Sequence, residues 1–456
     1  MPGLNSIMDT SLSGLFAAQA GLATTGHNIA NANTPGYSRQ MVKFSSRRPD
    51  VLPFGAIGRG VDILGVRRIQ DEFLLNNLRS QSSRLASYTE VDTALYEVES
   101  ILGSVDNDYL GTALNDYFKA WGELANPPIT DGLKDNVFEK AQTLVSGFHA
   151  INDSLLDLEA NIETSIQAEI TNLNRLLTAV ADMNSQIMKA ETNGQPANDL
   201  RDQRDLLITM VSEIAEVSVL ERGDGTKDII LAGRTMVARE SVTLFQSSYQ
   251  ASDDGVEMVI LTQDTFQEVR LSRGKLEGLL TSRDVHIKKA REQLDNVAAK
   301  LITEVNALHV QGRTSSSSGM GFFTGDSMHT IGINPAIADN HTLIVTGRTD
   351  APGDVDIAMA IADLANVGLG GPSDQSVGDV YREMLISVAS KRNSFEFAVE
   401  NQQNVVASLQ TKIASVSGVS LDEEASQMVR YQNSYNAAAK VISTVQEMYN
   451  TLLQMI

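Results

Sequence analysis

The hydrophobic positions at the two ends of the chain follow helical spacing. Near the start, apolar residues recur mostly three or four residues apart, at Leu4, Met8, Leu12, Leu15, Ala18, Leu22 and Ile29. Near the end the alternation of three and four is strict, at Met428, Tyr431, Tyr435, Ala438, Ile442, Val445, Tyr449 and Leu452. Each row predicts a helix that buries one face against another helix, as in a coiled coil.

Helical patterns also fill most of the interior. They cover residues 69–105, 110–125, 134–192 and 378–417. The third is amphipathic along its whole length and, if continuous, is about 90 Å long at a rise of 1.5 Å per residue.

A different pattern occupies residues 217–273, where short β-branched runs alternate with Asp-Gly and Ala-Gly turns. Helical spacing then returns, followed by an irregular segment at 314–377 in which "HTLIVTG" (341–347) is expected to be a strand. The expected fold is mainly α with an inserted β domain: elongated, with paired terminal helices, a long-helix bundle and a small β-rich outer domain.

These patterns predict three domains. Residues 1–60 and 419–456 form a terminal helical domain, and 217–273 form the β-rich outer domain. The helical bundle domain takes residues 61–216 and 274–418, including the irregular segment 314–377.

Charged residues are depleted at both ends of the chain. The chain has a formal net charge of −21, yet Asp9 is the only full charge before Arg39. The C-terminal end is similarly poor in charge. Within residues 430–456 the charged side chains are Arg430, Lys440 and Glu447. Because desolvating an unpaired ion is costly, surfaces depleted of charge suit protein contacts. We therefore expect both ends to be enclosed by other protein, in a head-to-tail contact that does not close and builds a tube.

The segment "GHNIANANTPGYSRQ" (26–40) contains dense turn signals, and its turn motif comprises Asn28, Asn31, Asn33, Thr34, Pro35, Gly36 and Tyr37. Asn31 and Asn33 are expected to end the helix in the left-handed conformation. Pro35 and Gly36 suit the two central positions of a type II turn. Arg39 beyond the turn is expected to meet water or a charged partner.

Composition excludes several classes of function. A sequence pI near 4.7 argues against binding to nucleic acid or to an anionic membrane surface. The absence of cysteine removes disulfides and Cys-based zinc sites. No secretory signal and no membrane-spanning run is expected.

Catalytic chemistry is not indicated by the sequence. The six histidines have no metal-ligand spacing, and phosphate-binding or nucleophile motifs are absent. The charged run Asp199, Arg201, Asp202, Arg204 and Asp205 is interpreted as a solvated helix face with local ion pairs. We therefore expect no catalytic, cofactor-binding or metal-binding residues.

Both terminal motifs resemble those of a known family. "TTGHNIANANTPGYSRQ" is similar to the N-terminal motif of bacterial flagellar rod, hook and hook-associated axial proteins, and "GVSLDEEASQMVRYQNSYNAAAKVISTVQEMYNTLLQMI" to their C-terminal motif. The "YSRQ" and "LDEEA" sequences and the interior segments "NDLRDQRDLL" and "GKLEGLLTSRD" resemble the hook-associated members that form the junction between hook and filament.

This resemblance implies a structural flagellar protein, exported through the flagellar type III channel without a cleaved signal and assembled extracellularly as a ring or tube layer. The implied partners are further copies of itself, the hook protein, the second junction protein (hook-associated protein 3) and an export chaperone on the C-terminal helix. Neither nucleic acid nor membrane is among them. The residues expected to pack in the assembly are Leu15, Leu22, Ile29, Met428, Tyr431, Tyr435, Ile442, Val445, Tyr449 and Leu452.

Two alternatives remain open at this stage. One is another flagellar axial protein, either hook or flagellin-like. The other is an enzyme with helical oligomerisation ends, which would need a convergent Asp/His or Asp/Arg set lining a polar cleft.

Overall fold

A computed structural model describes residues 4–52, 55–103, 109–126, 129–252, 255–314, 317–349, 351, 353–370 and 374–454. The chain divides into two compact units. The first comprises Met1–Leu85, Glu169–Gly274 and Gln402–Ile456, and the second Ala86–Ala168 and Lys275–Asn401. Three long helices contribute to both units: α2 (Glu72–Leu102), α4 (Asp131–Ala190) and α10 (Val377–Ser417). The three domains expected from the sequence divide the chain at other positions and stay a prediction.

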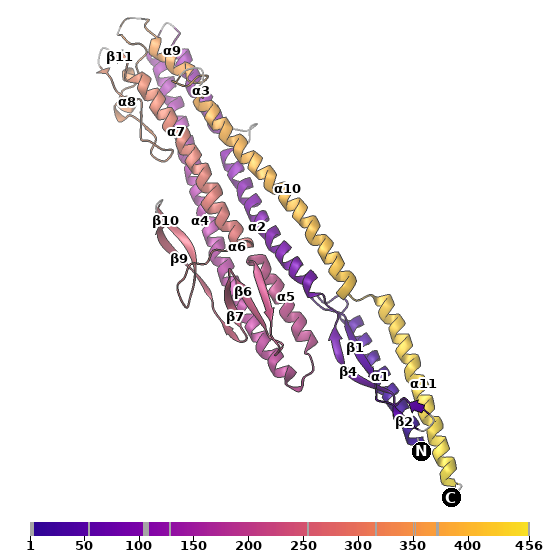
Figure 1. Cartoon of the computed structure of the whole chain (residues 1–456). Helices are drawn as coiled ribbons and strands as arrows, with labels where there is room; N and C mark the ends of the chain where they lie inside the picture. The colour runs from indigo at the N-terminus through magenta and orange to yellow at the C-terminus, as the bar shows by residue number, and fades with distance from the viewer. Residues whose placement is uncertain are drawn as a thin grey trace. The chain divides into compact units, whose positions relative to one another are not determined.

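The terminal helices pair within the first unit. Helix α1 (Leu4–Ala30) packs along α11 (Leu421–Gln454), and the two run antiparallel with both chain ends at the same end of the pair (Figure 1). Helix α11 begins with Asp422, Glu423 and Glu424 in its first turn, where acidic side chains favour the helix dipole. The expected pairing of the N- and C-terminal helices is confirmed.

Two β-ladders follow α1. Strand β1 (Gln40–Ser46) pairs antiparallel with β4 (Val61–Arg68), with a register irregularity between Lys43 and Phe44. Both strands contact α1. The short hairpin β2 (Asp50–Leu52) and β3 (Gly55–Ile57) lies between them in the sequence.

The remainder of the first unit holds the inserted β region. After a short 3-10 turn (Glu191–Asn193), helix α5 (Asn198–Ile214) leads into a four-stranded antiparallel sheet. Its strands lie in sequential order, as β5 (Val217–Glu221), β6 (Lys227–Leu231), β7 (Arg234–Ala238) and β8 (Ser241–Val242). A separate hairpin follows, formed by β9 (Phe245–Ser252) and β10 (Gly255–Thr262). This mainly α fold with a β insertion agrees with the expectation.

A buried amide attaches this sheet to α4. Asn184 of α4 is fully buried; its Nδ2 donates to the Lys227 carbonyl at 2.8 Å, and its Oδ1 accepts from the Lys227 N–H at 3.1 Å. Because both ends of the Asn184 amide are used, α4 and β6 are held in one register.

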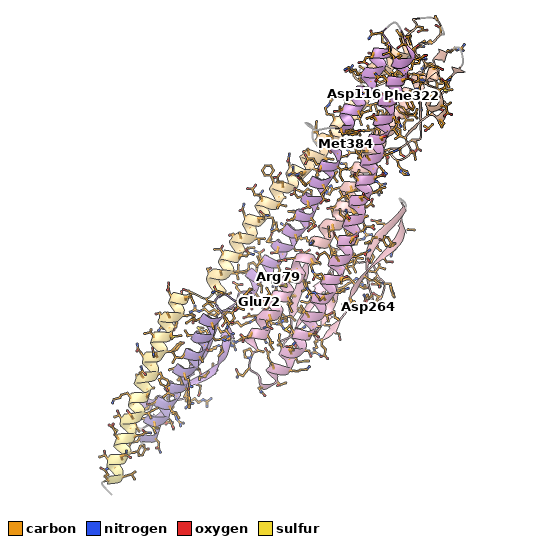
Figure 2. The ribbon with its side chains drawn as sticks, turned by 180° about the vertical axis from the view of Figure 1, so that it is seen from behind. Glu72, Arg79, Asp116, Asp264, Phe322 and Met384 are labelled. Carbon is orange, nitrogen blue, oxygen red and sulfur yellow. The ribbon has the colours of Figure 1, made fainter. Side chains whose placement is uncertain are left out.

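The second unit packs around an aromatic cluster. Helix α3 (Tyr109–Leu124) contributes the fully buried Trp121 and Tyr117, which contact the ring of Phe322 with centroids 5.6 and 6.0 Å apart. Figure 2 labels Phe322 in this cluster. Helix α6 (Lys275–Thr281) continues through a π-helical turn (Ser282–Ile287) into α7 (Lys288–His309).

Short elements complete the second unit. They are the strand pairs β11 (Arg313–Thr314) with β12 (Ser317–Ser318) and β13 (Phe323–Thr324) with β14 (Gly332–Ile333), together with helices α8 (Pro335–Asp339) and α9 (Asp356–Asp363).

The strand expected at 341–347 is not formed. His341–Leu343 is a 3-10 turn, and the backbone beyond it forms no β-ladder, although the Gly347 carbonyl accepts from the Arg313 N–H of β11 at 3.1 Å. The Val345 N–H donates to Nε2 of His309, and the Thr346 carbonyl accepts from the start of α9. The β-branched composition here serves burial of Ile344 and Val345 and not sheet pairing.

None of the described helices has both the length and the apolar content that a membrane crossing requires.

Candidate assembly site

Small residues occupy the buried side of α1, which meets both α11 and the β1–β4 ladder. The buried positions are Ser13, Ala17, Ala18, Gly21, Thr25 and Asn28, of which Ser13 meets β4, where its Oγ accepts from the Val61 N–H at 3.2 Å. Above Gly21 lies the ring of Tyr431, so close that a Cβ on Gly21 would stand 2.6 Å from Tyr431 Cε1. Because Gly21 has no side chain, the large Tyr431 side chain of α11 can approach the backbone of α1.

The α1 residues of the apolar row expected to pack in the assembly are partly covered in the single chain. Leu15, Leu22 and Ile29 are only half-buried. Leu22 follows Gly21 and is therefore turned by about 100° from the face that meets α11. The role of these residues in packing between copies stays a prediction.

On α11 the expected row does face α1. Val445 is buried, while Met428, Tyr431, Ile442 and Tyr449 are half-buried and Tyr435 and Leu452 are still exposed by 37 % and 49 %. The register is defined along the pair by Tyr449, whose hydroxyl bonds to Asn5, by Tyr431 over Gly21, and by Glu424 beside Asn28. A single narrow partner helix therefore leaves much of this row uncovered.

Large apolar side chains on both helices remain in contact with solvent in the single chain. They include Ile7, Leu12 and Phe16 on α1 and Leu421, Val429, Val441, Met448 and Leu453 on α11. Phe16 is 52 % exposed and Leu453 is 72 % exposed. Large apolar side chains exposed on two paired helices are consistent with further protein contacts in an assembly.

The turn after α1 is a type II turn, as expected. The Tyr37 N–H donates to the Thr34 carbonyl at 3.2 Å, and Gly36 has φ of 77°. That positive φ needs glycine, while Pro35 supplies the preceding position.

The left-handed conformation expected for Asn31 and Asn33 is wrong. Neither has a positive φ, because α1 unwinds through right-handed turns in which the Asn31 N–H still bonds the carbonyls of His27 and Asn28. Asn31 Nδ2 instead donates to the His27 carbonyl at 3.0 Å and so caps the helix end.

Asn28 joins α1, β1 and α11. Its Oδ1 accepts from the Gln40 N–H at 2.9 Å and from the Tyr37 hydroxyl at 2.7 Å. Its Nδ2 donates to the Gln40 carbonyl at 2.9 Å and to Glu424 Oε2 at 3.1 Å. At 1 % exposure, every polar atom of this amide is used, so the side chain fixes three elements together.

Arg39 meets a charged partner, as expected, and that partner lies within the chain. Arg39 Nε bonds Glu424 Oε1 at 2.6 Å, and Nη1 reaches Glu423 at 3.0 Å. Since Glu424 is only 2 % exposed, its charge depends on Arg39 and Asn28 for compensation. Burial and the nearby carboxylates of Asp199, Asp202 and Glu424 raise the pKa of Tyr37 well above its ordinary value, so the Tyr37 hydroxyl stays a donor.

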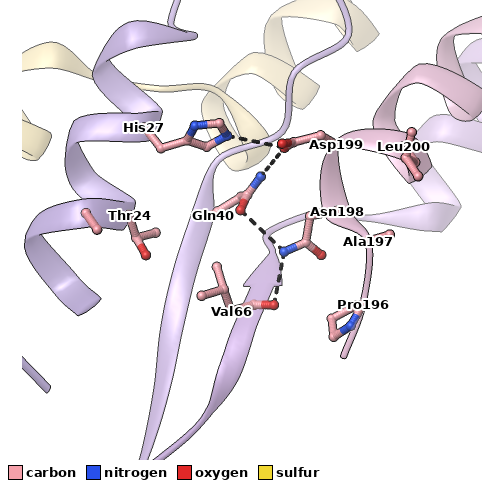
Figure 3. A pocket seen from close by; sticks show the side chains of 10 residues that line it. Thr24, His27, Gln40, Val66, Pro196, Ala197, Asn198, Asp199 and Leu200 are labelled. Carbon is pink, nitrogen blue, oxygen red and sulfur yellow. Dashed lines mark hydrogen bonds and ion pairs between the residues drawn. The ribbon is translucent and has the colours of Figure 1, made fainter. Parts of the chain in front are cut away.

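A shallow hollow lies between the end of α1, the β1–β4 ladder and the start of α5. It has a volume of about 500 Å³. His27 Nε2 lies 3.3 Å from Asp199 Oδ1, which also accepts from Gln40 Nε2 at 2.7 Å; Asn198 Nδ2 donates to Gln40 and to the Val66 carbonyl (Figure 3). These bonds attach the terminal elements to α5.

The charged run on α5 is not the solvated face expected. Asp202 and Asp205 are 5 % and 4 % exposed, and Arg204 is fully buried. Asp202 accepts from the Ser38 N–H at 2.9 Å, and Arg68 bridges Asp202 and Asp205 at 2.7 and 2.9 Å.

Asp205 forms ion pairs with cationic side chains from three elements. Lys227 of β6 lies 2.8 Å away and Arg79 of α2 3.6 Å away, in addition to Arg68 of β4; Figure 2 labels Arg79 and Glu72 on α2. Burial alone would raise the pKa of Asp205, but Lys227 and Arg68 outweigh it and hold that pKa well below its ordinary value.

For Asp202 and Arg204, which lie near Asp205 in the sequence, burial has a larger effect on the pKa than the nearby charges do. It raises the pKa of Asp202 and lowers the pKa of Arg204 to about 10. The cluster of Arg68, Arg79, Asp202, Asp205 and Lys227 joins α2, β4, α5 and β6 through buried ion pairs.

One signal in the sequence could have revealed this burial. Arg204 and Asp205 precede Ile208 and Val211 at helical spacing, so the charges continue the buried stripe of α5 and not its outer face.

Within the described part of the chain, no three His, Cys, Asp or Glu side chains are placed to hold a metal ion.

Comparisons with known proteins agree with this picture. The family model described as "Flagellar hook-associated protein FlgK helical domain" matches residues 95–323. The model "Flagella basal body rod protein" matches residues 8–37, and "Flagellar basal body rod FlgEFG protein C-terminal" matches 411–455.

The similarity to known proteins extends over nearly the whole chain. The chain is 27 % identical to flagellar hook-associated protein 1 of Bacillus subtilis, covering 98 % of this chain and 97 % of that protein. It is 24 % identical to flagellar hook-associated protein 1 of Salmonella typhimurium, over 99 % and 100 % of the two chains.

A solved structure, that of the flagellar hook junction protein FlgK from Burkholderia pseudomallei, shares the fold. Its TM-score is 0.67 at 14 % identity, with 75 % of this chain and 100 % of that chain covered. On the match of the helical-domain model to half of its length, the chain belongs to the family of the flagellar hook-associated protein FlgK.

Proposed function

We propose that this chain is a structural axial component of the bacterial flagellum that forms part of the junction between hook and filament. Family membership and the full-length similarity to hook-associated protein 1 support this role. Assembly proceeds through the helix pair α1–α11, because that pair combines a near absence of charge with uncovered apolar side chains.

The observation that carries the proposal is the incomplete coverage of α11. Of its described side chains only Glu424 and Val445 are buried, although its apolar row continues to Leu452. A helix that buries so little in its own chain gains the missing burial from neighbouring copies, at about 25 cal/mol per Å² of apolar surface.

The same proposal includes a finer arrangement. The terminal domain lines the inner tube, the helical bundle domain surrounds it, and the β region lies outward. The residues that pack in the tube are Leu15, Leu22, Ile29, Met428, Tyr431, Tyr435, Ile442, Val445, Tyr449 and Leu452. The neighbours are the hook protein on one side and hook-associated protein 3 on the other.

Export through the flagellar type III channel, with a chaperone on α11, completes the proposal. The exposed apolar row of α11 supports the chaperone, since such a surface must be shielded before assembly.

A catalytic role is not part of this proposal. The convergent Asp/Arg set that an enzyme would require does exist at Asp202, Asp205, Arg68 and Arg79, but these side chains are at most 8 % exposed and neutralise one another. A substrate has no access to them.

Complementation of a strain lacking the gene tests the function. Without the chain we expect hooks but no filaments, and flagellin lost to the medium. Leu22→Asp and Ile442→Asp should fail to restore filaments, because each places an unpaired carboxylate in the tube. Leu220→Asp, on the 54 % exposed Leu220 of β5, is the matched control and should restore them. Normal filaments with both terminal variants would contradict assembly through this pair.

A further inference from the structure

One segment of this acidic chain is basic. Residues 39–68 hold seven Arg or Lys side chains and two Asp, a net charge of +5, whereas the whole chain has a formal net charge of −21. The segment forms the β1–β4 ladder and the β2–β3 hairpin (Figure 1). Arg39 and Arg68 pair with acids of their own chain, but Lys43 and Arg48 are exposed and form no ion pair among the described residues. The segment therefore presents uncompensated positive charge to solvent.

Exposed apolar side chains accompany these cations. Strands β1 and β4 pack on α1, whereas β2 and β3 pair with each other. Val51 of β2 is 86 % exposed and Ile57 of β3 is 37 % exposed. A two-stranded hairpin is marginally stable in water by itself, so a partner that covers these side chains stabilises it. We call Lys43, Arg48, Val51 and Ile57 the basic arm.

Helix α4 carries a surface of the opposite charge. Its residues 141–174 include five Asp or Glu side chains and no Arg or Lys. Asp153 and Asp157 are exposed and form no ion pair among the described residues. Each is two residues from the buried Leu155, so each is turned by about 160° from the side of α4 that faces the core. Leu156 beside them is 40 % exposed. We call Asp153, Leu156 and Asp157 the acidic face of α4.

The acidic face gains from an external cation. Two like charges four residues apart on a helix repel each other and destabilise it by a few tenths of a kcal/mol in isolated helices. Asp153 and Asp157 have this spacing, and a positive side chain placed between them relieves the repulsion.

The basic arm and the acidic face are complementary in charge and in apolar character. Contact between Val51 or Ile57 and Leu156 buries apolar area, and the surrounding opposite charges orient the two surfaces and exclude like-charged ones. Every copy of the chain carries both surfaces. Because the two surfaces are different, a contact between them is heterologous and repeats from copy to copy in an assembly.

We infer that, in the assembly, the basic arm of one copy packs on the acidic face of α4 in a neighbouring copy. This inference rests on the proposed function. It assigns a contact to the β2–β3 hairpin and to the middle of α4, outside the terminal helix pair.

The chain contains no cysteine, so engineered cysteines that leave all the charges in place test the contact. Ala160 is exposed one turn beyond Asp157 on the same side of α4. In flagella isolated from cells that carry Val51→Cys/Ala160→Cys, a short bismaleimide should give a ladder of cross-linked multimers on a denaturing gel.

The matched control is Val51→Cys/Thr178→Cys. Thr178 is also exposed and lies on the same side of α4 as Ala160, but five turns, about 27 Å, further along. It should give no ladder. The inference is overturned by the absence of a ladder with Ala160→Cys, by equal ladders in both variants, or by a bridge within one monomer.

A photoreactive label identifies the occupant of the basic arm. Val51→Cys carrying a benzophenone maleimide should, on irradiation of the isolated flagella, attach to a peptide of this chain that contains Asp153 and Asp157. Mass spectrometry of the product measures this. Attachment to a different axial protein, or to another part of this chain, would contradict the assignment.

Charge reversal supplies a measurement that does not depend on cysteine variants. Lys43→Glu/Arg48→Glu should lower the amount of chain in isolated flagella about tenfold or more, and adding Asp153→Lys/Asp157→Lys should return it to within about threefold of the original. Lys189→Glu/Lys412→Glu makes the same change in net charge at two exposed lysines and should stay within about twofold.

The outcomes separate this inference from the proposed function. An equal loss with both lysine-to-glutamate controls and arm variants, or no rescue by the α4 lysines, counts against the contact. If the unmodified chain is itself absent from flagella, the proposed function fails; if it is present but shows neither cross-link nor rescue, only this inference fails.

Discussion

The ring of Tyr431 lies against the backbone of Gly21, in the contact between the N- and C-terminal helices. A Cβ at Gly21 would meet three ring atoms of Tyr431 at 2.6–2.7 Å. The pairing of the ends thus depends on a missing side chain on α1 as much as on the apolar row of α11.

Substituting Gly21 should therefore separate the helices. Gly21→Ala should destabilise the α1–α11 pair by about 1–3 kcal/mol through overpacking, although alanine favours a helix more than glycine does. Amide exchange along α1 measures this locally. Gly14→Ala and Gly26→Ala are the controls, since no atom lies within 4 Å of a Cβ at either position. They should stabilise α1 or leave it unchanged; equal loss at all three positions would contradict the contact.

Removing the cation beside Glu424 should be costly. Arg39→Met leaves a carboxylate that is 2 % exposed with only the Asn28 amide, and we expect a loss of about 3–5 kcal/mol in the stability of the first unit. Urea unfolding followed by circular dichroism measures it. The double variant Arg39→Met/Glu424→Met should recover most of the loss, and Lys412→Met on the exposed surface of α10 should cost less than about 0.5 kcal/mol.

The joint at Asp205 should be acid-sensitive. Because its folded pKa is depressed below the ordinary 3.8, its stabilising contribution is present above that value and is lost as pH falls further toward the folded pKa. Asp205→Asn should cost about 3–5 kcal/mol at pH 7 and flatten the pH dependence below pH 4. Asp199→Asn, whose side chain is 58 % exposed, should cost less than about 1 kcal/mol.

A buried histidine in the second unit, His309, should make the stability of the protein depend on pH in a second range. His309 is fully buried; its Nδ1–H donates to the Met320 carbonyl and its Nε2 accepts from the Val345 N–H. Burial lowers its pKa from 6.5 to about 4. The unfolded chain therefore binds more protons between these values, so stability falls as pH drops from 6.5 toward 4, by about 3 kcal/mol in full.

Trp121 reports this titration. It is the single tryptophan, and its ring centroid lies 6.2 Å from that of His309. Thermal melts followed by Trp121 fluorescence at pH 4.5 and 7 should differ less in His309→Gln than in the unmodified chain. His286, whose pKa burial also lowers to about 4, requires the parallel variant His286→Gln. Identical pH dependence in all three proteins would contradict the assignment.

The ends of the isolated chain should exchange amide hydrogens faster than its interior. Residues 5–30 and 430–454 form a helix pair that buries mainly small side chains, whereas α4 is buried along Val137, Leu144, Leu155, Leu173 and Leu177. Hydrogen exchange of the purified monomer should show low protection at both ends and high protection in α4. Equal protection would mean that the ends need no neighbouring copy.

The sequence by itself determined the elements whose physics is local. Helical periodicity predicted α4 within three residues at each end, β-branched runs predicted the inserted strands, and Pro35-Gly36 predicted the type II turn. Depletion of charge at the ends predicted that they need partners, since that argument uses composition alone.

Tertiary structure decided which of two equally amphipathic faces meets which neighbour. Leu22 has the right spacing for the helix contact, but Gly21 occupies its centre because Tyr431 needs the space. The charged run of α5 could not be assigned from the sequence, because the cations that make its burial tolerable come from positions 68, 79 and 227. A carboxylate is stable in a protein interior only when such partners surround it, and partners distant in sequence are brought together by the fold alone.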